Sequence, residues 1–172
     1  ALDMFSKDGV CVSGISSKDI NRNNEKVILE LIWTLILHYS ICPSVISKPI
    51  KENKENSSLK WKNYKEALME WAIDRISNYP NVDNSFHPYD LSMCALLDYY
   101  IPERINFYSL NMKDSLNNSK LAINVTEDLG IPILIYPSEI AENNNNIDEK
   151  SLLAQLSSVK VVLDSLQKNE SI

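Results

Sequence analysis

Apolar residues are densest between Val27 and Ile41, where 11 of 15 positions are apolar. The polar residues Glu30, Thr34 and His38 recur every fourth position, so on a helix they share one narrow stripe. A helix that crosses a bilayer needs about 20 apolar residues in succession, so this segment is too short to span one. The pattern predicts a helix over 27–41 that is buried almost all round, with one thin wetted edge.

Five further segments have the apolar spacing or the terminal residues that are typical of helices. They span residues 1–8, closed by Gly9, then 59–77, 90–100 and 115–129, and finally 148–166, which begins at the N-cap Asp148. A loop of small polar residues is expected between Gly9 and the apolar helix. The run 131–136 comes nearest to a strand but is interrupted by Pro132. The sequence therefore predicts an all-α protein.

The composition changes abruptly after the apolar helix. Residues 42–57 are rich in lysine, glutamate, asparagine and serine and include Pro43 and Pro49. Such a segment has too little apolar surface to fold alone, so it is predicted to be a linker. The linker separates a short N-terminal unit, 1–41, from a larger one, 58–168.

The overall composition excludes several classes of protein. In 172 residues, 44% are apolar and 23% charged, which is ordinary for a globular protein and unlike a disordered or fibrous one. The net charge of −6 argues against general nucleic-acid binding, which needs a basic face. Three widely spaced cysteines suit reduced thiols in the cytoplasm better than a disulfide framework; they are Cys11, Cys42 and Cys94.

Residues that carry chemistry are sparse. The two histidines, His38 and His87, lie in different segments, the chain has no CxxC motif, and its three glycines form no phosphate-binding loop. Cys11 or Cys94 could meet a histidine only through folding, and cysteines inside helices more often belong to the core. We therefore predict no catalytic residue, metal site or cofactor, and no enzymatic activity.

A basic stretch stands out against the acidic background. Between residues 48 and 65 the sequence has six lysines and two glutamates, a local charge of +4 that leaves −10 for the rest. These lysines could be a solvated linker and helix face, or they could form an edge that docks on an acidic protein surface or an anionic lipid. Trp61 could be an interface anchor there or could pack inward. The candidate binding residues from charge are Lys60, Trp61 and Lys62.

Five segments resemble a known family. DINRNNEKVILELIWTLILHYSI (19–41) resembles the end of the first calponin homology (CH) domain in tandem actin-binding regions of the filamin, α-actinin and spectrin type. ALMEW (67–71) and MCALLDYYIPERINF (93–107) resemble segments of the second CH domain, and LGIPILIYPSEI (129–140) and DEKSLLAQLSSV (148–159) are most similar to filamins. The family's tryptophan-x-aspartate-glycine signature reads HPYD here, at 87–90. The resemblance implies a CH fold, with 58–168 a complete second domain and 1–41 the C-terminal half of a first.

The resemblance also implies a function. It points to a region that binds actin filaments (F-actin) in a filamin-like crosslinking protein of the cytoplasm and cytoskeleton. The family pattern carries a contact role onto Lys26, Leu29, Trp33, Leu37 and Lys65, although a core role is equally open for Trp33. The apolar helix then needs a cover, which could be a preceding segment, the second domain or a neighbouring copy.

An alternative function uses the same residues differently. Second CH domains of this family bind actin weakly by themselves, so the chain could be a regulatory module for protein interaction or dimerisation with little actin affinity. The lysines between 48 and 65 could also bind phosphoinositide lipid.

Overall fold

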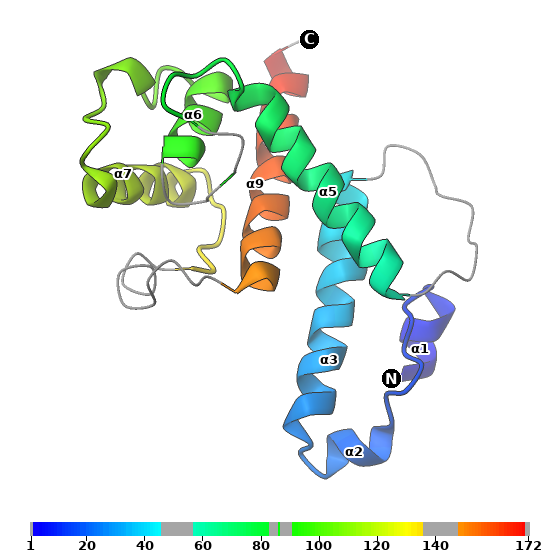
Figure 1. Cartoon of the computed structure of the whole chain (residues 1–172). Coiled ribbons are helices and arrows are strands. Elements are labelled where there is room, and N and C mark those ends of the chain that lie inside the picture. The colour runs from blue at the N-terminus through cyan, green and yellow to red at the C-terminus, as the bar shows by residue number, and fades with distance from the viewer. Residues whose placement is uncertain (1, 46–56, 83–85, 87–90, 136–147, 171–172) are drawn as a thin grey trace. The chain divides into compact units, whose positions relative to one another are not determined.

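The computed structural model describes residues 2–45, 57–82, 86, 91–135 and 148–170, with side chains described in the same ranges except at 44–45, 57–62 and 168–170. The chain divides into two compact units, Ala1–Glu52 and Asn53–Ile172. Every regular element within the described ranges is a helix, which confirms the all-α prediction (Figure 1).

The described part of the first unit, residues 2–45, has five consecutive helical elements. They are α1 (Leu2–Lys7), α2 (Ser17–Asn21), α3 (Glu25–Ile36), the π-helix η1 (Leu37–Ile41) and α4 (Cys42–Val45) (Figure 1). Gly9 ends the α1 turn with φ +86, as its position after the helix predicted. The expectation of a loop before the apolar helix missed α2, which starts where the Ser16 hydroxyl accepts a hydrogen bond from the Lys18 amide at 3.1 Å.

The apolar segment is helical throughout but not uniform. It is an α-helix from Glu25 to Ile36 and then widens into the π-helix η1. The predicted linker 42–57 begins with the helical turn α4, and its residues 46–56 lie outside the described residues.

The expectation that this helix is buried almost all round is wrong. None of the α3 residues is buried; Leu29 is 63% and Ile32 47% exposed. The other described helices of the first unit have only four to six residues each; α2 packs against α3, and α4 packs against η1. In η1, His38 lies against Gly9, and the Tyr39 hydroxyl donates a hydrogen bond to the Asp8 carboxylate.

Within its described residues, the second unit has four longer helices and one short turn. They are α5 (Ser57–Ile76), α6 (Leu91–Tyr100), the 3₁₀ turn η2 (Phe107–Ser109), α7 (Ser115–Asp128) and α9 (Glu149–Glu170) (Figure 1). The four long helices begin within two residues of their predicted starts. The turn η2 was not predicted, because three residues are too few to show a helical period.

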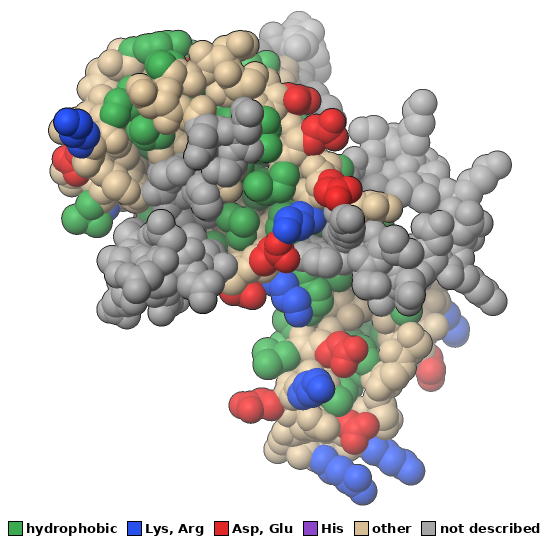
Figure 2. Space-filling model, viewed as in Figure 1, with side chains coloured by type: hydrophobic (Ala, Val, Ile, Leu, Met, Phe, Trp, Pro, Cys, Tyr) green, Lys and Arg blue, Asp and Glu red, His purple; other side chains and the backbone are tan. Residues whose placement is uncertain are grey.

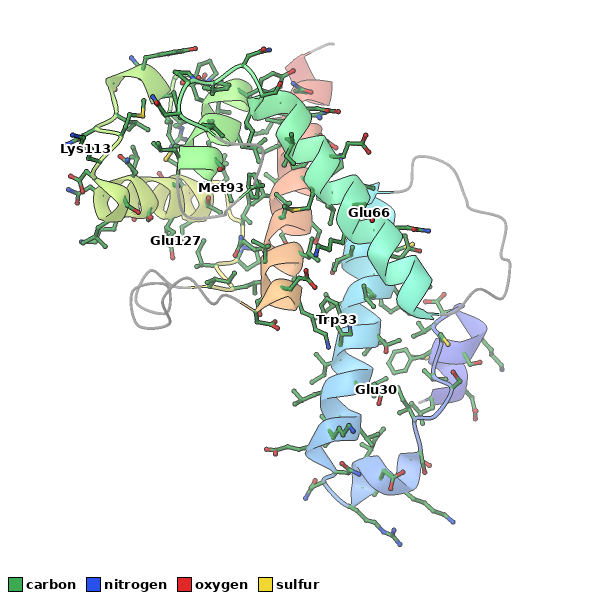
Figure 3. All side chains as sticks on the ribbon, in the orientation of Figure 1. Glu30, Trp33, Glu66, Met93, Lys113 and Glu127 are labelled. Carbon is green, nitrogen blue, oxygen red and sulfur yellow. The ribbon has the colours of Figure 1, made fainter. Side chains whose placement is uncertain are left out.

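The core of the second unit is built around α6. This helix packs against α5, α7 and α9, and all residues from Ser92 to Leu97 are buried. Figure 3 labels Met93 on this helix. The neighbouring helices α5 and α9 also contribute large, fully buried apolar side chains, which include Leu68, Ile76, Leu153, Leu156 and Leu163. The central helix of this unit is therefore α6.

A buried glutamine forms hydrogen bonds with the segment that follows α7. The Gln155 side chain, on α9, accepts a hydrogen bond from the Leu134 amide at 2.8 Å and donates one to the Pro132 carbonyl at 3.1 Å. Gln155 is 1% exposed, so these bonds satisfy a buried amide. They hold residues 131–135 against α9 without strand pairing.

Candidate functional site

Four of the residues with a predicted contact role lie along one side of a continuous helical segment. Lys26, Leu29 and Trp33 are on α3, and Leu37 is the first residue of η1. Their spacings of three and four residues place them on one face. Lys26 and Leu29 are exposed, whereas Trp33 and Leu37 are half-buried. We call this set the α3 face.

The α3 face continues into a residue that the sequence analysis did not select. Ile32 lies three residues after Leu29 and is also exposed, so the two form a neighbouring apolar pair. Its exposure was missed because the helix was expected to be buried almost all round. Figure 2 shows apolar side chains between charged ones over the part of the chain that α3 occupies in Figure 1.

The charges along the α3 face are mixed. Glu30 lies one turn from Trp33, as Figure 3 shows, and its backbone carbonyl accepts a hydrogen bond from the Thr34 hydroxyl at 2.8 Å. Lys26 is exposed one turn before Glu30. The face is therefore an apolar strip with one base and one acid at its border, which suits contacts with a partner that is itself part apolar.

The predicted basic edge lies on α5, and one of its lysines is already paired. The Lys65 ammonium forms an ion pair with the Glu149 carboxylate at the start of α9. Both side chains are more than one-third exposed, so the pair is solvated and contributes little to stability. The side chains of Lys60, Trp61 and Lys62 lie outside the described residues, although α5 includes their backbone.

The tryptophan of the ALMEW segment has a structural role. Trp71 is 8% exposed, and its ring lies under the Arg75 guanidinium at 5.0 Å and the Lys160 ammonium at 4.7 Å. The Tyr100 hydroxyl accepts a hydrogen bond from Arg75 Nε at 2.6 Å and donates one to Asp164 at 3.0 Å. Burial raises the pKa of Tyr100 to about 12. This network joins α5, α6 and α9 rather than forming a reactive site.

Cys94 and His38, which were considered for catalysis, both pack against other groups of the fold. Cys94 is buried, and its thiol lies 3.4 Å from the Asn118 carbonyl oxygen, as expected for a core cysteine. The His38 ring packs edge to face on Tyr39. His87 lies outside the described residues. Among the residues that the structure describes, no group of three His, Cys, Asp or Glu side chains could hold a metal ion.

None of the helices in the described part of the chain combines the length and the apolar character needed to cross a bilayer.

The helical core around α6 defines the class of protein. The family model of the calponin homology (CH) domain matches residues 62–161, which is more than half of the chain. The chain therefore belongs to the calponin homology domain family.

The matching residues lie within the second unit.

Curated relatives extend the similarity into the first unit. The chain is 34% identical to interaptin of Dictyostelium discoideum over 162 residues, which are 91% of this chain and 9% of that protein. It is 30% identical to alpha-actinin-1 of Homo sapiens over 176 aligned positions, covering 99% of this chain and 18% of that protein. Alpha-actinin-1 of Gallus gallus gives the same values. The chain thus spans less than one-fifth of the length of each of these relatives.

Proposed function

We propose that this chain is an actin-filament-binding region of a cytoskeletal crosslinking protein of the filamin type. In this proposal residues 1–41 are the C-terminal half of a first CH domain, 42–57 are a linker and 58–168 are the second CH domain. The exposed apolar pair Leu29 and Ile32 on α3 carries the proposal. Membership of the CH family and the similarity to alpha-actinin-1 support it.

The α3 face is proposed as the contact because burying its exposed apolar side chains in an interface would release free energy. Burying a leucine or isoleucine side chain contributes about 1.5–3 kcal/mol, and Leu29 and Ile32 remain largely accessible. A specific interface buries about 800 Å² on each partner, of which a few anchors supply most of the energy. In the proposed complex Leu29 and Trp33 are anchors, and Leu37 extends the contact.

Filament co-sedimentation tests this proposal with a matched pair of leucines. Leu29→Ala should weaken binding about fivefold or more, because truncating an anchor costs more than about 1 kcal/mol. Leu116 on α7 is 55% exposed and serves as the control, so Leu116→Ala should bind like the parent chain. Trp33→Ala should weaken binding as Leu29→Ala does. If both α3 variants remain folded and bind with unchanged affinity, the α3 face is not the contact.

The basic edge is proposed to act on the rate of association. Reversing Lys60, Lys62 and Lys65 to glutamate should slow association with filaments and flatten its dependence on salt, because these charges act at long range. Unchanged rates at low and high salt would show that the edge takes no part.

A second function is favoured by the position of the family match. Residues 62–161 lie within the second unit, so the chain could be a regulatory second-CH-type module that has little affinity for filaments. In that case the folded chain does not pellet with filaments, and binding appears only when a first CH domain is joined to it. Sedimentation velocity then tests self-association, and flotation with phosphoinositide-containing vesicles tests lipid binding by the lysines between 48 and 65.

A further inference from the structure

Two tyrosines of the second unit stack on each other, and a third lies on the helix α6, which contacts η2. Tyr79 follows α5, Tyr99 lies on α6 and Tyr108 lies in η2. Tyr108 is 69% and Tyr99 47% exposed, whereas Tyr79 is half-buried. The rings of Tyr79 and Tyr108 are nearly parallel, with 19° between their planes and 6.2 Å between their centroids. We call these three residues the tyrosine platform.

The platform is held by one carboxylate. Asp98 accepts a hydrogen bond from the Tyr79 hydroxyl at 2.7 Å and another from the Phe107 amide at 2.9 Å. Phe107 is fully buried, and its ring packs edge to face on both Tyr79 and Tyr108. The exposed Tyr108 is therefore fixed from below by a core residue, and Tyr79 is fixed by Asp98.

The surroundings of Tyr79 favour its neutral phenol. Burial, the hydrogen bond to Asp98 and the proximity of Tyr108 and Tyr99 raise the pKa of Tyr79 well above its usual value. Tyr79 therefore remains a neutral donor to Asp98 at physiological pH. A binding surface that is ordered before its ligand arrives loses little conformational entropy on binding.

The chemistry of the platform fits a proline-rich ligand. Polyproline II segments have no internal hydrogen bonds, so their carbonyls remain available, and they dock on surfaces of aromatic rings. Tyr99 and Tyr108 offer exposed rings, and neither hydroxyl has a hydrogen-bond partner within the described residues. Each can supply ring contact and a donor to a peptide carbonyl.

The charges on the turn that joins α6 to η2 indicate the sign of the ligand. Glu103 and Arg104 lie on the turn between α6 and η2, and Arg104 is paired with Asp128 at 3.3 Å. Glu103 is exposed and forms no ion pair within the described residues, so the charge left on this turn is negative. We propose that the tyrosine platform binds a proline-rich segment of another protein that has an arginine or lysine beside its prolines. This site is separate from the α3 face and does not depend on actin binding.

Calorimetric titration of the 172-residue chain tests the proposal. The probe is a synthetic peptide of ten prolines flanked by two arginines, and the control peptide has glycine and serine in place of proline. The proline peptide should bind with a Kd below about 1 mM and the control peptide should not. Tyr108→Ala and Tyr99→Ala should each weaken binding about tenfold, because each removes an exposed aromatic anchor. Leu116→Ala should leave the affinity unchanged.

Glu103→Gln tests the charge argument separately. It should weaken binding of the arginine-flanked peptide but not of a ten-proline peptide with uncharged ends. The proposal is overturned if the arginine-flanked proline peptide does not bind the parent chain, or if it binds the tyrosine variants as tightly as the parent chain. It is also overturned if the proline peptide and the glycine-serine control bind alike. Sedimentation velocity without peptide provides a further test, because self-association that Tyr108→Ala abolishes would make the platform an interface between copies. Far-UV circular dichroism of each variant checks that it is folded.

Discussion

Removing the carboxylate of Asp98 should destabilise the second unit strongly, although Asp98 is only half-buried. Asp98→Ala deletes the acceptor of two hydrogen bonds, one from the Tyr79 hydroxyl at 2.7 Å and one from the Phe107 amide at 2.9 Å. Hydrogen bonds to a charged group contribute about 1.5–3 kcal/mol each. Because Asp98 is partly accessible to water, the lower value applies, and the two bonds together predict a loss of about 3 kcal/mol. Tyr79→Phe removes one of the bonds and should cost about half as much.

The measurement is urea unfolding followed by far-UV circular dichroism, with amide hydrogen exchange of α6 as a probe of the second unit alone. The control is Asp128→Ala, which removes an ion pair with Arg104 at 3.3 Å between two largely exposed side chains. The free energy of unfolding of this variant should fall by less than about 1 kcal/mol. If Asp98→Ala loses no more stability than Asp128→Ala, Asp98 does not hold the tyrosine platform and this reasoning is refuted.

Three further outcomes are expected. Gln155→Leu leaves the Leu134 amide and the Pro132 carbonyl without their partner, so it should cost about 1–3 kcal/mol of stability in urea unfolding. Amide exchange at Leu134 should become faster, and unchanged exchange would contradict the role of Gln155 in holding residues 131–135. Glu149→Gln removes the partner of the Lys65 ammonium, so at low salt it should speed association with filaments. It should change the free energy of unfolding by less than about 1 kcal/mol. An unchanged association rate would show that Lys65 takes no part in the encounter with the filament. The pKa of Tyr100 is raised from 10.0 to about 12, so between these pH values the unfolded chain loses the phenolic proton while the folded chain keeps it. The contribution of Tyr100 to the free energy of unfolding is therefore fully present below pH 10 and is lost as the pH rises toward 12. Over this pH range the urea midpoint should fall less steeply in Tyr100→Phe than in the parent chain.

The sequence by itself predicted the long helices, because their signals are local. Apolar spacing, Asp148 before the last helix and Gly9 and Gly130 after two others act within a few residues of the chain. The same local signals failed for α2 and η2, which are too short for a periodic pattern. Quoted segments from both units also sufficed to identify the CH family, since they keep their residues in order along the chain.

Only the tertiary structure decided which apolar surface is covered and which charges are paired. The segment 27–41 has the composition of a core helix, but burial depends on what packs against it, and the short helices of its unit leave Leu29 and Ile32 exposed. Lys65 and Glu149 are 84 residues apart, and nothing in the spacing of charges along the chain indicates that they meet. The tyrosine platform likewise combines distant parts of the chain, because folding brings Tyr79 against Tyr108 and packs α6, which carries Tyr99, against η2. Helix formation follows from neighbouring residues, whereas burial, ion pairing and binding surfaces follow from contacts between distant ones, and so the sequence determined the elements and the fold determined the sites.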